Sequence, residues 1–298
     1  MKKAIIVFIL GFSSFSFGQG CSDAGICSVG NNFSTTIDAT KNQLEVGNVF
    51  GKGLEDIVYF SPYISYTRHF SSHFSLTSKI TYSQATGSFG TRGNIADAFL
   101  IGNYKFSEKN NKQWSTLLGI KIPFTQSNDK INNFSIPLDY QSSLGTYDLF
   151  LGANLKYKKW DFNSAIQIPV INKNGNSYFD EYSASNDFPT TNLFERKSDA
   201  LFRSMYTFKS KNQKFTYKPN LLFIYHLGND SFENIFGQRE EIKNSAGLTA
   251  NANFITNYKI NNTNSIEASI AFPFVVREIR PDGLTRAVTL GINYKYSF

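Results

Sequence analysis

The charged residues that could do chemistry recur at a regular spacing along the chain. Three aspartates are each followed eight to ten residues later by a lysine, and two more lysines occupy the matching place in later segments. The acidic set is Asp97, Asp148 and Asp199, and the basic set is Lys105, Lys156, Lys209, Lys259 and Lys295. Alternate residues of a strand share one face, so these even spacings place both charges of each pair on the same face.

If these segments are strands around a pore, the spacing predicts a carboxylate tier near the outer mouth and a lysine ring near the periplasmic mouth. Such a ring would raise the local anion concentration and favour anions, with Glu267 as its most exposed opponent. The alternative is that the charges are ordinary solvated residues at the ends of strands.

The residues that an enzyme would need are sparse. A hydrolase requires a histidine held by a carboxylate or amide beside a nucleophile, and this chain has only His69, His73 and His226. Neither a G-x-S-x-G motif nor a metal-ligand spacing is present. We therefore expect no enzymatic activity, no metal and no cofactor. The basic residues form no patch in the sequence, so nucleic-acid binding is not expected.

The N-terminus has the pattern of a cleaved signal peptide. Lys2 and Lys3 precede an apolar run from Ala4 to Phe12, and small residues precede Gln19. This pattern predicts removal of residues 1–18. Gly18 stands three residues before Cys21, where a lipoprotein signal would have an apolar residue, so no lipid anchor is expected.

Residues 19–41 are too polar to form another span. Cys21 and Cys27 would be exported into an oxidising compartment, where a small disulfide loop is expected; a metal or redox site with Asp23 is the less favoured alternative. The segment either hangs free in the periplasm or folds into the lumen as a plug.

From residue 42 onward the hydrophobic pattern has a period of two, which indicates strands. In the final segment one face is apolar, and Arg286 is the only charge on it. Twelve strands are predicted, with ten or fourteen as alternatives, near residues 42–50, 55–69, 73–84, 94–106, 113–125, 146–158, 160–171, 198–209, 214–227, 246–259, 264–279 and 284–298.

Short and long connections alternate between these strands. Turns such as Lys158-Lys159 are short, whereas the loops near 126–145, 172–197 and 228–245 are long. Short periplasmic turns and long extracellular loops are typical of an all-β, antiparallel, up-and-down transmembrane barrel, here spanning residues 42–298. Tyr178, Phe179, Tyr182 and Phe188 could make the loop 172–197 a gate, although such loops are more often surface covers.

A water-soluble β-sandwich would also alternate, but the aromatic residues favour the barrel. They form 16% of the chain and cluster at one end of successive strands, as an interfacial girdle would require. The chain also ends on Tyr294, Tyr296 and Phe298, which are in phase with an apolar row. This ending is similar to the signal that the barrel-insertion machinery reads.

Two passages resemble a known group of proteins. The strand Gly119-Ile120-Lys121-Ile122-Pro123 has the form G-x-K-x-P, and residues 144–152 have the form L-G-x-x-D-x-x-x-G. Across residues 95–170 the chain resembles outer-membrane "transporter" proteins grouped with a phenol-degradation meta-pathway component, although Phe124 and Thr125 replace the usual Thr-Gly. The resemblance implies a channel for hydrophobic or aromatic compounds, like the fatty-acid transporters.

Three prolines occupy equivalent places near the outer ends of outward-running strands, at Pro123, Pro169 and Pro273, and each is predicted to face the lumen. A shared bulge at the rim is the favoured interpretation. The alternative is a kink that opens a lateral gap for an apolar solute.

The sequence as a whole predicts a passive outer-membrane channel for small, hydrophobic or anionic solutes. A structural barrel that partners an envelope complex and a surface receptor or adhesin remain open alternatives. The expected partners are outer-membrane lipid and lipopolysaccharide, the barrel-insertion machinery and a small solute; a homo-oligomer is also open.

Overall fold

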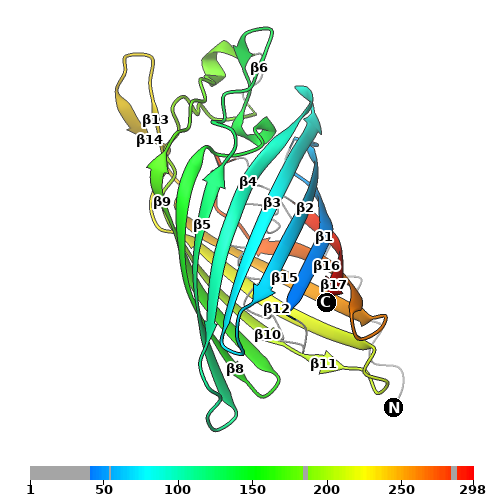
Figure 1. Cartoon of the computed structure of the whole chain (residues 1–298). Coiled ribbons are helices and arrows are strands. Elements are labelled where there is room, and N and C mark those ends of the chain that lie inside the picture. Colours follow the sequence, from blue (N-terminus) through cyan, green and yellow to red (C-terminus); the bar gives the residue numbers. More distant parts are fainter. Residues whose placement is uncertain (1–40, 54, 184–186, 283–286) are drawn as a thin grey trace, which may run out of the picture.

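The chain folds into a closed barrel of antiparallel strands (Figure 1). The structure, a computed structural model, describes residues 41–53, 55–183, 187–282 and 287–298. Neighbouring strands in the sequence are neighbours in the wall, and pairing of β1 with β17 and of β10 with β12 closes the sheet on itself. Closure leaves no open sheet edge in the wall, which a membrane-spanning sheet requires.

The wall strands before the midpoint of the chain are β1 (Asn42–Lys52), β2 (Val58–His69), β3 (Phe74–Gly87), β4 (Gly90–Lys105), β5 (Lys112–Pro123) and β8 (Thr146–Tyr157). Those after it are β9 (Trp160–Asn172), β10 (Asp199–Tyr206) with its short continuation β11 (Phe208–Lys209), β12 (Phe215–His226), β15 (Gly247–Lys259), β16 (Asn264–Val275) and β17 (Val288–Ser297). With β10 and β11 as one strand, the wall has the twelve strands predicted, and the predicted fold class is confirmed.

The two faces of the wall differ as the period-two pattern predicts. On β17, Leu290 and Ile292 point outward and are 51% and 53% exposed, whereas Thr289 points into the lumen and is 6% exposed. Lipid-facing side chains have no protein neighbour outside them, and lumen-facing side chains are enclosed by the wall. The exposed apolar rows therefore form the membrane-facing surface.

Aromatic side chains gather at the end of the barrel where the connections are short. Their rings contact each other in pairs, such as Tyr104 with Phe106, and Trp160 with Tyr206, at centroid distances of 5.2 and 4.8 Å. Tyr296 and Phe298 make the same kind of contact at the end of the chain. This arrangement matches the girdle expected at a membrane interface, where amphipathic rings are most stable.

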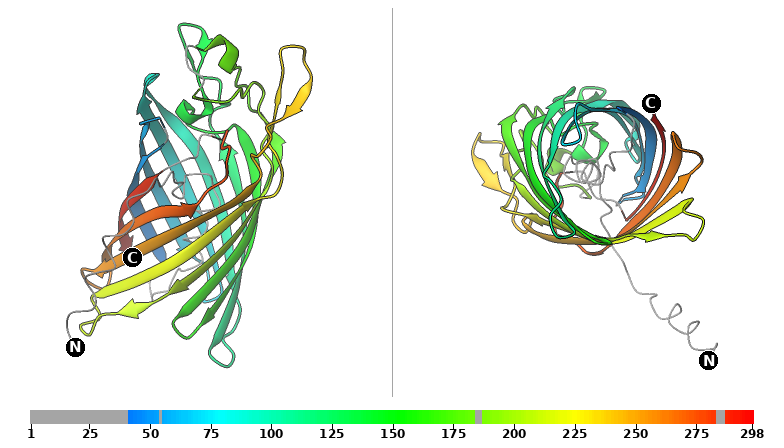
Figure 2. Two further views of the ribbon diagram at one scale, coloured as in Figure 1. Left: turned by 180° about the vertical axis from the view of Figure 1, so that it is seen from behind. Right: turned by 60° about the horizontal axis from the view of Figure 1, so that its bottom comes forward.

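The long loops stand together at the opposite end of the barrel (Figures 1 and 2). They contain the short hairpins β6 (Lys130–Ile131) with β7 (Phe134–Ser135), and β13 (Ser231–Glu233) with β14 (Arg239–Glu241), and the 3-10 turns η2 (Leu138–Tyr140) and η3 (Asp180–Tyr182). We call the apolar cluster of Ile57, Tyr59, Ala85, Ile136, Tyr140, Tyr178 and Phe188 the loop core. It packs two long loops against the outer ends of β2 and β3.

Within the described residues, no helix is long and apolar enough to cross a membrane. The predicted signal peptide, the predicted disulfide between Cys21 and Cys27 and most of the predicted N-terminal plug lie outside the described residues.

Candidate functional site in the barrel interior

The predicted acidic tier lies at the outer ends of β8 and β10 and in the middle of β4, where Asp97 pairs with Pro123 at the outer end of β5. Asp97, Asp148 and Asp199 are 5%, 2% and 2% exposed, and all three have the lumen-facing phase of their strands. Buried carboxylates are costly unless they are paired or hydrogen-bonded. The structure supplies such partners to each of them.

Asp148 forms a buried ion pair with Lys121 of β5, whose Nζ lies 2.9 Å from its Oδ2. Lys121 also donates to the hydroxyl of Thr146 at 3.0 Å, and the amide of Gln167 donates to Asp148. Asp97 accepts a hydrogen bond of 2.7 Å from Ser143 in the loop before β8. The tier therefore does not present bare carboxylates to the lumen.

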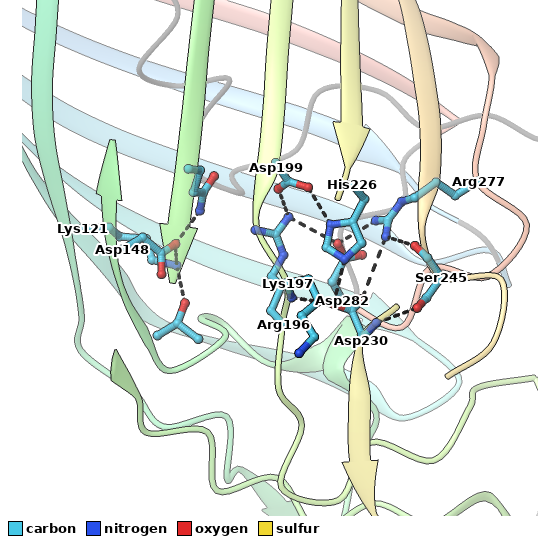
Figure 3. A network of polar contacts seen from close by, with 12 residues as sticks. Lys121, Asp148, Arg196, Lys197, Asp199, His226, Asp230, Ser245, Arg277 and Asp282 are labelled. Carbon is cyan, nitrogen blue, oxygen red and sulfur yellow. Dashed lines mark hydrogen bonds and ion pairs between the residues drawn. The ribbon is translucent and has the colours of Figure 1, made fainter. Parts of the chain in front are cut away.

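Asp199 belongs to a buried network that joins the ends of β10, β12 and β16 to the extracellular loops (Figure 3). Arg196 pairs with Asp199, and Asp199 also contacts Nδ1 of His226 at 2.6 Å. The other ring nitrogen of His226, Nε2, lies 2.7 Å from Asp230. Since ionised carboxylates only accept hydrogen bonds, this geometry is satisfied when both ring nitrogens carry protons.

The second half of this network is built on Arg277, just after β16. Its guanidinium lies 2.8 Å from Asp282 and donates to the backbone carbonyl of Ser245 at 2.7 Å. Arg196 also approaches Asp282, at 3.5 Å. The hydroxyl of Ser245 accepts from the backbone N–H of Asp230 at 2.8 Å, which links the two halves. We call this set the outer-mouth network.

Burial and charge act in opposite directions on the loop residues of this network. Burial alone would raise the pKa of Asp282, but Arg277 and Arg196 outweigh it and hold that pKa well below its usual range. Burial would lower the pKa of Arg196, but Asp199 and Asp282 hold it above its usual range. Both groups are therefore charged at neutral pH.

Asp139 in η2 behaves differently. Burial raises its pKa to about 7, and Asp282 adds to this effect, while the backbone and Arg280 only partly oppose it. This carboxyl therefore titrates near neutral pH at the base of the long loops.

The inner wall carries an apolar patch next to these charges. Its side chains come from five neighbouring strands and are at most 4% exposed. They are Phe99, Ile101, Leu117, Phe150, Leu201 and Leu222, and we call them the lumen patch. Sequence reasoning missed this patch, because in each strand these residues share a face with charged and polar neighbours. Phe99, for instance, lies between Asp97 and Ile101 on the lumen face.

The predicted lysine ring lies at the inner end of the barrel, where the turns are short. Lys156, Lys209 and Lys259 are exposed, and Lys105 is half-buried. In the part of the chain that the structure describes, none of these four forms an ion pair. Their role in ion selectivity stays a prediction.

Lys295 differs from the other members of the ring. Its Nζ lies 3.2 Å from Glu267 and 3.6 Å from Glu45. Glu267 is 9% exposed, so the expectation that it is the exposed opponent of the ring is wrong: pairing with Lys295 across β16 and β17 buries it. Sequence reasoning missed Glu45, whose signal was its lumen phase in the predicted strand near residues 42–50.

The three prolines have the lumen-facing phase of their strands, and Pro273 is buried. The pairing register shifts beside two of them. One shift lies between Tyr147 and Asp148, opposite Pro169. The other lies between Ala250 and Asn251, opposite Pro273. A shift in register is the signature of a bulge, which is the favoured interpretation at these two sites. Pro123 pairs in register with Asp97.

The histidines offer no catalytic arrangement in the described residues. Both nitrogens of His226 face carboxylates, so neither is left to activate a nucleophile. His73 contacts its neighbour Ser72 at 2.9 Å in a short turn of the inner end. The described residues also contain no group of three His, Cys, Asp or Glu side chains that could hold a metal ion.

The fold is similar to that of an outer-membrane channel from Pseudomonas putida F1. The two align with a TM-score of 0.57 and 12% identity over 88% of this chain and 97% of that one. The NanC porin (TM-score 0.48, 11% identity, 86% and 98% coverage) and the KdgM porin in complex with disordered oligogalacturonate (0.45, 8%, 86% and 99%) are more distant.

No protein-family model and no curated protein sequence matches the chain. The likeness to the Pseudomonas channel confirms the family resemblance at the level of the fold. The chain therefore has the fold of a twelve-stranded outer-membrane β-barrel.

Proposed function

We propose that this protein is a passive channel through which small solutes cross the outer membrane. One observation carries the proposal: a closed barrel with an apolar outer surface has an inner wall of charged, amide and hydroxyl side chains. A polar inner wall is typical of transmembrane barrels, and twelve strands enclose a wider lumen than the eight-stranded barrels that side chains fill. The fold shared with a protein described as an outer-membrane channel supports the same function.

The inner wall favours anionic solutes. The acids of the outer end are compensated by Lys121, Arg196 and Arg277, whereas four lysines of the inner end are not paired within the described residues. The excess of positive charge at that end attracts anions. The side chains of the lumen patch are packed against one another, with at most 4% of each exposed, so they support the wall and leave the charged ends to select the solute.

Solute entry into protein-loaded vesicles tests the proposal. Vesicles that contain the folded protein and vesicles that contain only lipid are mixed with isotonic solutes, and osmotic swelling is followed by light scattering. We expect small carboxylates to enter faster than cations of equal size. Equal swelling of the two vesicle preparations for every solute would refute a channel.

A further inference from the structure

The extracellular loops form a cavity that the proposed channel function does not use. It has a volume of about 650 Å3, within the usual range of small-molecule sites. Three segments line it: the turn between β3 and β4, the β6–β7 hairpin, and the loop that contains η3. Five aromatic side chains contribute to its wall: Phe89, Phe134, Tyr178, Phe179 and Tyr182.

The base of this cavity is rigid because it rests on the loop core. Phe89 contacts the rings of Tyr140 and Phe188 at centroid distances of 5.2 and 5.9 Å. The amide of Asn176 donates to the carbonyls of Ser127 and Ile136 at 3.0 Å each, and so ties the η3 loop to the loop before β8. A site held in this way loses little conformational entropy when a ligand binds.

Two rings of the wall are unusually exposed for aromatic side chains outside the membrane girdle. Phe134 and Tyr182 are each 73% exposed. Both belong to loops at the extracellular end of the barrel, so lipid does not cover them. Tyr182 is oriented by an edge-to-face contact with Phe179 at 5.8 Å. Exposed, oriented rings beside a preformed cavity mark a binding surface.

The polar groups around these rings select the ligand. Asn133 and four serines supply neutral donors and acceptors, and Lys130 and Asp187 contribute one charge of each sign, which cancel. Ser88 already contacts the hydroxyl of Tyr140, and Ser135 contacts Ser177, but a hydroxyl that makes one hydrogen bond can still accept another. A fully apolar ligand would make no use of this capacity, and an ion would meet no net opposite charge. A pyranose ring has one apolar C–H face and an edge of hydroxyl groups, so it satisfies both the rings and the polar groups.

We propose that this loop cavity binds a neutral pyranose unit of a saccharide at the cell surface. Such a ring can come from a free oligosaccharide or from the core of lipopolysaccharide around the barrel. In either case the sugar stacks on Tyr182 and Phe134 and accepts or donates hydrogen bonds at the polar edge.

Isothermal titration calorimetry of the full chain tests this proposal. The protein is kept in a zwitterionic detergent without a sugar headgroup and titrated with maltose, lactose and cellobiose, and with delipidated lipopolysaccharide core oligosaccharide. We expect saturable binding of at least one of these probes, weakened about tenfold by Tyr182→Ala and by Phe134→Ala, because each removes one stacking ring. Binding of the core oligosaccharide alone would identify the membrane's own saccharide as the source.

Phe236→Ala is the matched control. Phe236 is 79% exposed in the turn between β13 and β14 and does not line the cavity, so its loss should leave the affinity unchanged. Absence of binding by the unmodified protein to all four probes would overturn the proposal, and so would binding that survives the loss of both rings. The titration needs no transport, so either result is separate from the fate of the proposed channel.

Discussion

Replacement of Lys121 by methionine should destabilise the barrel strongly. Lys121 and Asp148 are 3% and 2% exposed, and the variant would leave Asp148 buried with only the Gln167 amide as a partner. Across 2.9 Å the Coulomb attraction is ~6 kcal/mol at an effective dielectric constant of ~20. Because desolvation of both ions offsets part of this attraction, we expect a loss of about 3–5 kcal/mol in the free energy of unfolding.

The double variant Lys121→Met with Asp148→Leu is the informative control. It removes both charges, so no ion is left buried, and most of the lost stability should return. Urea unfolding of the protein in lipid vesicles measures both variants, since the two tryptophans, Trp114 and Trp160, lie in the membrane-facing wall and report on their surroundings. A single variant as stable as the unmodified protein, or a double variant as weak as the single, would refute the reasoning.

Three further predictions concern selectivity, pH and assembly. Replacement of Lys105, Lys156 and Lys259 by glutamine should shift the reversal potential in a salt gradient towards cations, because unpaired positive charge is removed from the inner end. Asp139 has a folded-state pKa of about 7, above its ordinary 3.8, so its contribution to loop stability is complete below about pH 4 and is lost as the pH rises through about 7. The hydrogen-exchange protection factors of residues 130–145, which are corrected for the intrinsic pH dependence of amide exchange, should fall accordingly. Deletion of Phe298 should lower the amount of barrel inserted in cells while leaving refolding in detergent intact.

Each of these predictions has a result that contradicts it. An unchanged reversal potential in the triple-glutamine variant would show that the inner lysines are ordinary solvated residues at the ends of strands. Protection factors in the loops that do not depend on pH, or that keep the same pH dependence in Asp139→Asn, would exclude titration of Asp139 as the cause. Normal insertion without Phe298 would remove the C-terminal aromatic from the assembly signal.

The strands could be predicted from the sequence because the alternation of apolar and polar residues within each segment shows which side chains face lipid and which face the lumen. Residues 146–158 and 160–171 alternate cleanly, and β8 and β9 lie within one residue of those bounds. The short turn between them, at Lys158-Lys159, is equally local. Register then followed from the turn, because the inward phase of one strand fixes that of the next.

The partners of the lumen charges could not be predicted in this way. Asp199 and Lys295 were placed by phase, but their partners depend on contacts between distant segments. Arg277 and Asp282 lie in the loop after β16, and Ser245 lies in a second loop, before β15, so their contacts depend on how the two loops pack. Glu45 and Glu267 meet Lys295 because β17 lies between β1 and β16, which is a consequence of barrel closure.

Single-channel recording of the purified, folded protein in planar bilayers, with a salt gradient across the membrane, tests the proposed channel most directly. Discrete openings with a reversal potential that favours anions are the predicted result. A correctly folded barrel that inserts into the bilayer but passes no current, with or without residues 19–41, would contradict a channel function.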